Sequence, residues 1–159
     1  MIAELECPEK IASDTDATVK ICFVCSGNTC RSPMAAAVLN HLGKGAYICS
    51  SAGLCAVAGD VISPNSVRAL TLAGIESTPE NNYKEHRARE TSDELLERFD
   101  TIVAISRSHM INLICSYPHL ADKITVMSRD IPDPFMCGEQ TYVKCLETIT
   151  ECLKEMFPI

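Results

Sequence analysis

The stretch between residues 19 and 39, VKICFVCSGNTCRSPMAAAVL, constrains the fold more than any other part of this chain. It begins with a short apolar run, Val19–Val24, whose β-branched and aromatic residues are typical of a buried strand. The run stops at Cys25, and small polar residues follow it. Among these, Gly27 and Asn28 belong to residue types that adopt positive φ readily, so the pattern predicts a strand that ends in a tight loop.

A helix is predicted directly after this loop. Ser32 and Pro33 form a typical helix start, a hydroxyl cap followed by proline, and an Ala-rich segment continues to about Leu42. The backbone N–H groups of such a loop can converge on one point, where the helix N-terminus adds its positive end. Strand, loop and helix together predict a site for an anion of the size of phosphate.

Two side chains of this loop suit chemistry on a phosphate group. Cys25 is placed beneath the anion as a nucleophile, and Arg31 offers a planar, two-pronged donor to two of its oxygens. The loop amides, the helix end and Arg31 all favour the thiolate, which is the form of cysteine that attacks phosphorus. The alternative is that Cys25 is a core residue beside a solvated arginine.

Length and charge limit the possible function classes. The chain has 159 residues, enough for one domain with a sizeable core, and no apolar run approaches the length of a membrane span. Its formal net charge of −7 disfavours nucleic acid or an anionic membrane as the partner. We expect a monomer or a weak dimer.

The ten cysteines are expected to be reduced thiols rather than a disulfide framework. The acidic N-terminus lacks the apolar core of a secretion signal, and Cys22, Cys49 and Cys145 lie in apolar periodic segments, which predicts a cytoplasmic protein. The single C-x2-C pair joins Cys22 and Cys25 in the predicted strand, where an offset of three places them on opposite faces. No cysteine set has zinc spacing, and the chemistry requires no metal or other cofactor.

The rest of the chain alternates between strand and helix patterns. Further strands are predicted at 46–49, 101–105 and 123–127. Further helices are predicted at 64–72, from about 91, from 106 to before Pro118, and at about 139–156. Apolar residues recur at helical spacing on one face of the last helix and mark that face as core: Tyr142, Leu146, Ile149, Leu153 and Met156.

This alternation predicts an α/β fold with an open, four-stranded parallel sheet covered by helices on both faces. Ligands of such sheets bind beyond the carboxyl ends of the strands, at the topological switch. Cys25 lies at one such end, and Asp133 follows the fourth predicted strand. Asp133 is therefore a candidate general acid at the same edge. As an Asp before proline, it could instead simply begin a turn.

The sequence VCSGNTCRSP closely resembles the loop of the low-molecular-weight protein tyrosine phosphatase family, and the resemblance extends from Val19 to the C-terminus. It implies a flavodoxin-like fold, one phosphatase domain over residues 19–159, and phosphorylated proteins as substrates. Residues 1–18 precede this resemblance. Because they are polar, acidic and without periodicity, we interpret them as a flexible N-terminal extension.

The resemblance implies a role for each residue of the site. Cys25 is similar to the family's nucleophile, Arg31 to its phosphate clamp, Ser32 to its thiolate donor, and Asp133, in Asp-Pro-Phe, to its acid. Asp130 is the alternative acid. The phosphate-binding loop that the resemblance implies comprises Ser26, Gly27, Asn28, Thr29, Cys30, Arg31 and Ser32.

Supporting residues are implied in the same way. Asn28 resembles the residue whose left-handed conformation and side-chain bonds hold the family's loop, and Ser51 and His86 resemble the partners of that asparagine. His86 could equally be a surface histidine. Cys30 resembles a second loop cysteine that can form a protective disulfide with Cys25, although packing beneath the loop would also explain a small residue there.

Two positions bear on the substrate. Thr29 stands where tyrosine-directed members usually carry Ile or Leu, and members that act on protein phosphoarginine carry Thr there. Phe135 lies in Asp-Pro-Phe-Met, where many tyrosine-directed members have Asp-Pro-Tyr-Tyr. A phosphotyrosine ring prefers an aromatic-sided slot. The resemblance therefore slightly favours phosphoarginine, with phosphotyrosine as the alternative.

Two other functions use a similar loop. Thioredoxin-coupled arsenate reductases continue it with Gln where this chain has Pro33, and they use two further cysteines on a mobile helix. Four later cysteines form no convincing pair between the second and third strands: Cys115, Cys137, Cys145 and Cys152. A non-catalytic phosphate-binding module needs no acid, so the presence of Asp133 together with Arg31 disfavours it.

Overall fold

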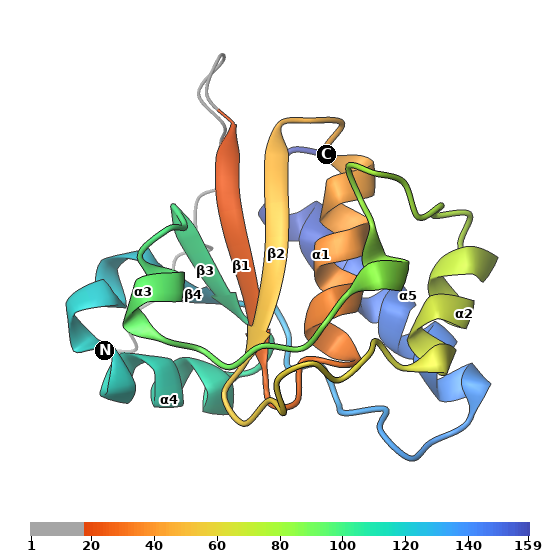
Figure 1. Cartoon of the computed structure of the whole chain (residues 1–159). Helices are drawn as coiled ribbons and strands as arrows, with labels where there is room; N and C mark the ends of the chain where they lie inside the picture. Colours follow the sequence, from red (N-terminus) through yellow and green to blue (C-terminus); the bar gives the residue numbers. More distant parts are fainter. Residues whose placement is uncertain (1–17) are drawn as a thin grey trace, which may run out of the picture.

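Four parallel strands form a single sheet in the computed structural model, which describes residues 18–159 (Figure 1). The strands are β1 Val19–Cys25, β2 Tyr47–Gly53, β3 Thr101–Ala104 and β4 Ile124–Val126. Their order across the sheet is β2-β1-β3-β4, and every neighbouring pair is parallel. The predicted open parallel sheet is therefore confirmed. The predicted N-terminal extension covers residues 1–18, of which 1–17 lie outside the described residues.

Helices cover both faces of this sheet, as the sequence predicted. The helices are α1 Arg31–Leu42, α2 Pro64–Leu72, α3 Asp93–Leu96, α4 Arg107–Ser116 and α5 Glu139–Met156, with short 3-10 turns η1 Tyr83–Glu85 and η2 Pro118–Lys123. In Figure 1, α1, α2 and α5 lie on one side of the sheet and α3 and α4 on the other. None of the helices in residues 18–159 combines the length and apolar character that a membrane crossing requires.

The alternating side chains of β1 divide the core into two layers. Ile21, Phe23 and Cys25 belong to the layer under α1 and α5, whereas Cys22 and Val24 belong to the layer under α3 and α4. The two cysteines of the C-x2-C pair therefore point to opposite faces, as their offset predicted. Burial raises the pKa of Cys22 to about 12, so this thiol stays protonated and packs as a small apolar residue.

The last two long helices show where helical spacing does and does not determine burial. All five residues predicted on the inner face of α5 are buried: Tyr142, Leu146, Ile149, Leu153 and Met156. In α4, by contrast, Ile111 and Ile114 are exposed, while His109 and Leu113 are buried. A histidine thus occupies an inward position that hydrophobic patterning assigns to an apolar residue.

The cap of α1 lies two residues earlier in the chain than predicted. The helix begins at Arg31, with Cys30 in the N-cap position, so Ser32 lies inside the first turn instead of capping it. The Ser32 hydroxyl contacts Cys25 Sγ and accepts a hydrogen bond from Asn28. This side chain therefore serves the loop rather than the helix end.

The carboxyl end of β1 lies at the point where the chain changes direction across the sheet. The chain passes from β1 to β2 on one side and returns to β3 on the other. β2 is longer than predicted, because it stays paired with β1 up to the last pair, Cys25 with Gly53. Ligands of open α/β sheets bind at such a switch. In Figure 1 this is the lower edge of the sheet.

Candidate active site

Residues 25–31 form a tight loop between β1 and α1, and we call this segment the 25–31 loop. Asn28 has a φ of 58°, which is the left-handed conformation that the sequence led us to expect. The loop rests on the segment that follows β2. The N–H of Leu54 donates to the Cys25 carbonyl and the N–H of Cys55 donates to the Ser26 carbonyl, each at 2.9 Å.

Asn28 is completely buried and holds this loop through four hydrogen bonds. Its Nδ2 donates to Ser32 Oγ and to Ser51 Oγ, both at 2.9 Å. Its Oδ1 accepts from the backbone N–H of Arg89 at 3.0 Å, and its carbonyl accepts from His86 Nε2 at 2.7 Å. The structure thus brings Ser51 and His86 to the side chain and backbone of Asn28. Arg89 was not anticipated, because it contributes a backbone group that no side-chain pattern reveals.

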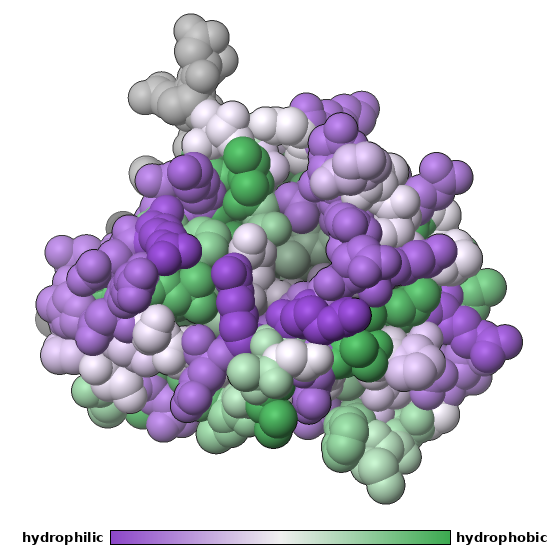
Figure 2. All heavy atoms as spheres, viewed as in Figure 1, coloured by the Kyte–Doolittle hydropathy of each residue, from purple (hydrophilic) through white to green (hydrophobic). Residues whose placement is uncertain are grey.

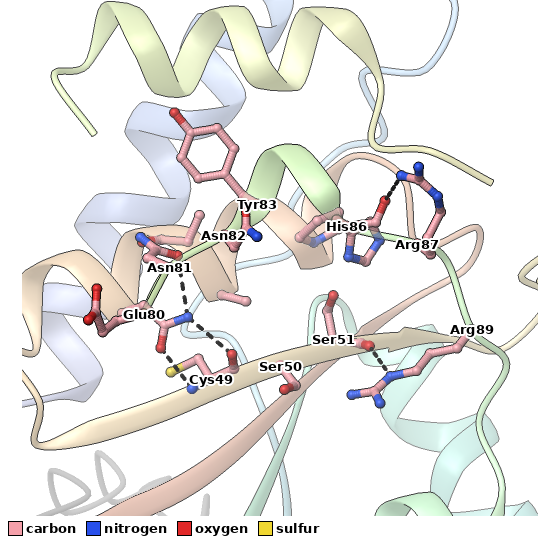
Figure 3. A pocket seen from close by; sticks show the side chains of 14 residues that line it. Cys49, Ser50, Ser51, Glu80, Asn81, Asn82, Tyr83, His86, Arg87 and Arg89 are labelled. Carbon is pink, nitrogen blue, oxygen red and sulfur yellow. Dashed lines mark hydrogen bonds between the residues drawn. The ribbon is translucent and has the colours of Figure 1, made fainter. Parts of the chain in front are cut away.

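Three partners of Asn28, namely Ser51, His86 and Arg89, line a cavity of about 340 Å³ behind the loop (Figure 3). Arg89 Nε donates to the Ser51 carbonyl at 3.1 Å, which fixes this side chain along the outer edge of β2. Burial lowers the pKa of His86, so its ring is neutral and must carry the proton on Nε2 to donate to Asn28. These residues therefore support the left-handed turn of the loop from behind.

Cys25 lies at the carboxyl end of β1 and is almost fully buried beneath the loop. Its Sγ lies 2.9 Å from Ser32 Oγ. Because Ser32 Oγ accepts a hydrogen bond from Asn28 Nδ2, its own proton can point towards the sulfur. The N-terminus of α1, which begins at Arg31, adds positive potential at the same place. Each of these features stabilises negative charge on Cys25.

Arg31 connects the loop with the segment that follows β4. Its side chain is only 8% exposed, and its Nη1 donates to the Ile131 carbonyl at 3.0 Å. Its Nη2 lies 3.6 Å from Asp133 Oδ2, and the other oxygen of that carboxylate accepts from the backbone N–H of Phe135 at 3.0 Å. Asp133 itself is half exposed. The structure therefore places the candidate acid beside the candidate phosphate clamp, with solvent access.

Asp130, the alternative acid, makes a different contact. Its Oδ1 accepts from the backbone N–H of Arg107 at 2.9 Å, where a carboxylate complements the N-terminus of α4. The segment that carries Asp133 is thus held by two hydrogen bonds. Its Asp130 accepts one from α4, and its Ile131 carbonyl accepts the other from Arg31. Asp130 thus contacts the N-terminus of α4, whereas Asp133 contacts Arg31 of the loop.

A pocket of about 220 Å³ lies in front of the loop. Its lining comes from three segments of the chain: Cys25, Gly27, Asn28, Thr29, Cys30, Arg31, Cys55, Val57, Asp60, Asp133 and Phe135. Val57 and Phe135 are largely exposed, and Figure 2 shows apolar side chains gathered along this lower edge of the molecule. The sequence did not indicate Cys55, Val57 and Asp60, because the segment after β2 carries no motif that identifies which of its residues line a pocket.

Comparison with known proteins identifies the family. Residues 20–158 match the family model of the low molecular weight phosphotyrosine protein phosphatases. This chain belongs to that family. It is 31% identical over 146 residues to the protein-arginine-phosphatase of Geobacillus stearothermophilus, an alignment that covers 86% of this chain and 94% of that protein. The resemblance inferred from the 25–31 loop is therefore confirmed.

Tyrosine-directed relatives reach the same percentage identity. The low-molecular-weight protein-tyrosine-phosphatase Wzb of Salmonella typhi is 31% identical over 121 residues, covering 73% of this chain and 76% of Wzb. The crystal structure of the low-molecular-weight protein tyrosine phosphatase of T. tengcongensis superposes with a TM-score of 0.78 at 31% identity, covering 87% of this chain and 97% of that one. This chain is thus an enzyme, a low-molecular-weight protein phosphatase.

In this phosphatase the second loop cysteine, Cys30, packs against α5. Its Sγ lies 3.4 Å from Tyr142 Oη and 3.6 Å from Ser63 Oγ. Burial, followed by the contact with Cys30, raises the pKa of Tyr142 to about 12, so the phenol stays protonated. Cys25 and Cys30 are both free thiols. The protective disulfide between them that the family resemblance implies stays a prediction.

The cysteines considered for an arsenate reductase lie elsewhere in the phosphatase. Cys115 and Cys137 are exposed, whereas Cys145 and Cys152 are buried in α5. All four follow β3 in the chain, so none lies between β2 and β3, where the resemblance to those reductases would require a pair. Their positions agree with the family assignment.

The packing beneath the loop yields a first prediction for the phosphatase. A Cβ at Gly53 would lie 2.5 Å from the Ser26 carbonyl oxygen and 3.0 Å from Asn28 Cβ. Gly53→Ala must therefore displace the loop backbone, and we expect it to lower the free energy of unfolding by about 1–3 kcal/mol and to reduce turnover. Urea unfolding and p-nitrophenyl phosphate turnover measure the two effects.

Gly138 provides the matched control, because a Cβ there would meet no atom within 4 Å and its φ of −79° is open to alanine. Gly138→Ala should keep its turnover and lose less than about 1 kcal/mol of stability, the scale of an altered helix cap. If Gly53→Ala matched the unaltered protein in both stability and turnover, close packing at Gly53 would not support the loop.

Proposed function

We propose that this phosphatase hydrolyses phosphorylated protein side chains through a phosphocysteine intermediate on Cys25. The observation that carries the proposal is the 2.9 Å contact between Cys25 Sγ and Ser32 Oγ, in a pocket that Arg31 and Asp133 also line. A stabilised thiolate, a cation for the phosphoryl oxygens and an acid for the leaving group thus converge at one place.

The first half of the reaction transfers the phosphoryl group to the enzyme. The Cys25 thiolate attacks phosphorus, and the bond between phosphorus and the substrate's oxygen or nitrogen breaks. Arg31 and the backbone N–H groups of the loop bind the phosphoryl oxygens, where charge develops in the transition state. Asp133 gives its proton to the departing atom, so a tyrosine side chain departs as a neutral phenol and an arginine side chain as a guanidinium cation.

The second half regenerates the enzyme. Asp133, now a carboxylate, accepts a proton from a water molecule as that water attacks the phosphocysteine. The bond between sulfur and phosphorus breaks, inorganic phosphate is released, and the hydrogen bond from Ser32 stabilises Cys25 as the leaving thiolate. Asp133 ends the cycle protonated, so protons and charge balance.

The charges of the pocket favour a phosphoarginine substrate. Asp60 and Asp133 both line it, and a second carboxylate near a phosphate dianion is electrostatically unfavourable. A phosphorylated guanidinium group carries positive charge beside its phosphoryl group, which offsets this repulsion. Thr29 lines the same pocket, and its hydroxyl can accept a guanidinium N–H. The similarity to a protein-arginine-phosphatase supports this choice, and the 31% identity to Wzb makes phosphotyrosine the alternative.

The experiment has one arm for the mechanism and one for the substrate. Rapid acid quench during p-nitrophenyl phosphate turnover, without added metal or reducing system, should trap one phosphate per enzyme on Cys25. The ratio of kcat/KM for a phosphoarginine peptide to that for a phosphotyrosine peptide of the same sequence should exceed one. Turnover without trapped phosphocysteine would reject the mechanism, and a strong preference for phosphotyrosine would reject the substrate choice.

Asp60 yields a prediction for this specificity. Asp60→Asn removes the carboxylate without changing its shape, so kcat/KM for the phosphoarginine peptide should fall about fivefold, the scale of one partly exposed ion pair, while that for the phosphotyrosine peptide should stay or rise. Thr29→Ile should shift the ratio in the same direction. Asp122→Asn, on η2, is the matched control. An unchanged ratio in Asp60→Asn would place the specificity elsewhere, in the rim around Val57 and Phe135.

A further inference from the structure

His109 is a buried histidine on α4 that the proposed reaction does not use. It is 4% exposed. Its Nε2 lies 2.9 Å from Ser26 Oγ, and its Nδ1 lies 2.7 Å from Ser106 Oγ. Ser106 is the N-cap residue of α4, and Ser26 follows Cys25 directly. The imidazole therefore bridges a helix N-terminus and the first residue of the loop after the candidate nucleophile.

The protonation state of His109 suits a bridging role. Burial, followed by the positive charge of Arg31, lowers the pKa of His109 to about 4, whereas Asp133 and Asp130 act in the opposite direction. The ring is thus neutral at pH 7, with one donor and one acceptor nitrogen. A serine hydroxyl can either donate or accept, so one partner donates to the unprotonated nitrogen and the other accepts from the N–H. Both hydrogen bonds therefore form without a net charge beside Cys25.

The rest of the contact network shows what this bridge holds. The carbonyl of Ser26 accepts from the backbone N–H of Cys55 at 2.9 Å, while its hydroxyl is held by His109. The same end of α4 also contacts the segment that carries Asp133, because Asp130 accepts a hydrogen bond from the backbone N–H of Arg107. His109 thus links the loop that carries the candidate nucleophile to the helix that anchors the segment of the candidate acid.

We infer that His109 is a positioning residue of the 25–31 loop. By holding the Ser26 hydroxyl against the N-terminus of α4, it fixes the backbone at Ser26 in the orientation that binds the phosphoryl group. This inference rests on the proposed function of the loop. Donors that are already oriented need no rearrangement in the transition state, and a misplacement of about 1 Å can reduce the rate roughly 100-fold.

The first test measures anion binding and turnover separately. In His109→Ala, kcat/KM for p-nitrophenyl phosphate should fall roughly 10- to 100-fold, and the affinity for vanadate should fall with it. His109→Gln keeps one donor and one acceptor, so it should recover most of both losses. A cavity of about 370 Å³ beside the loop is lined by both Ser26 and His109, so added imidazole should partly restore His109→Ala.

A double-mutant cycle then tests the proposed route. If His109 acts through Ser26, the losses in His109→Ala and Ser26→Ala should not multiply in the double variant. The proton donor is unaffected, so the dependence of the rate on the leaving group should stay that of the unaltered enzyme. His41→Ala, an exposed histidine at the end of α1, is the matched control and should behave as the unaltered enzyme does.

Several results would overturn the inference. A merely structural histidine would lower the unfolding temperature of His109→Ala and leave vanadate affinity and kcat/KM unchanged in the folded protein. Fully multiplicative losses in the double variant would remove Ser26 as the route. If the unaltered chain turned over no phosphate ester, the proposed function would fail. A comparison of vanadate affinity between the unaltered protein and His109→Ala would still decide whether His109 positions the loop.

Discussion

Cys25→Ser is expected to abolish turnover of p-nitrophenyl phosphate, with a loss in kcat on the order of 10⁴-fold or more. The surroundings of Cys25, with Ser32 Oγ 2.9 Å away and the N-terminus of α1 above it, stabilise a thiolate. A serine hydroxyl has a far higher pKa than a thiol, so these contacts do not ionise it at pH 7. The serine hydroxyl is then a far weaker nucleophile than a thiolate, while the anion site around Arg31 persists.

Binding measurements separate this explanation from a collapsed site. Vanadate or phosphate should still bind to Cys25→Ser in a calorimetric titration, because the loop amides and Arg31 remain. Cys115→Ser changes an exposed thiol on α4 and is the matched control, with turnover expected within about twofold of the unaltered protein. Near-normal activity in Cys25→Ser would contradict its assignment as nucleophile.

The part of the site that sequence could predict is the part that local chemistry determines. A strand, two residues tolerant of positive φ, and a helix start all fall between Val19 and Leu42, so the 25–31 loop is encoded by neighbours in the chain. Asp133 could be placed near it by topology alone, because parallel strands bring their carboxyl ends to one edge. Periodicity likewise located the inner face of α5.

The remainder depends on contacts between distant segments that no local pattern specifies. Arg89 supports Asn28 across 61 positions through a backbone N–H, and His109 reaches Ser26 across 83 positions. Gly53 is required by the close approach of the Ser26 carbonyl, which depends on how two segments pack and not on a turn. Such features become visible only once the sheet order has placed these segments side by side.

The two roles open to Ser32 show how local and distant demands compete. As a hydroxyl before proline it fits a helix cap, which is what the local pattern predicts. In the structure its Oγ faces Cys25 and Asn28, and Cys30 takes the N-cap position without a side-chain hydrogen bond. The helix thus starts without the cap that the local pattern offers, and the hydroxyl stabilises the candidate nucleophile instead.

Asp133→Asn is expected to lower kcat/KM for phenyl phosphate about 10²–10⁴-fold and for p-nitrophenyl phosphate much less. Phenolate is a poor leaving group that needs a proton in the transition state, whereas p-nitrophenolate departs without one. The carboxylate lies 3.6 Å from Arg31 Nη2 and is half exposed, so it can both reach a substrate bound to Arg31 and exchange protons with water. Asparagine keeps the shape and the bond to the Phe135 N–H but has no acidic proton.

The comparison uses kcat/KM because this quantity reports only the steps up to the first phosphoryl transfer. The loss of Asp133 as a base in the second half of the reaction slows both substrates equally and would appear in kcat. Asp130→Asn is the matched control, since an amide oxygen still accepts from the Arg107 N–H and should keep α4 in place. Equal losses on the two substrates, or a larger loss in Asp130→Asn than in Asp133→Asn, would assign the proton donor to another group.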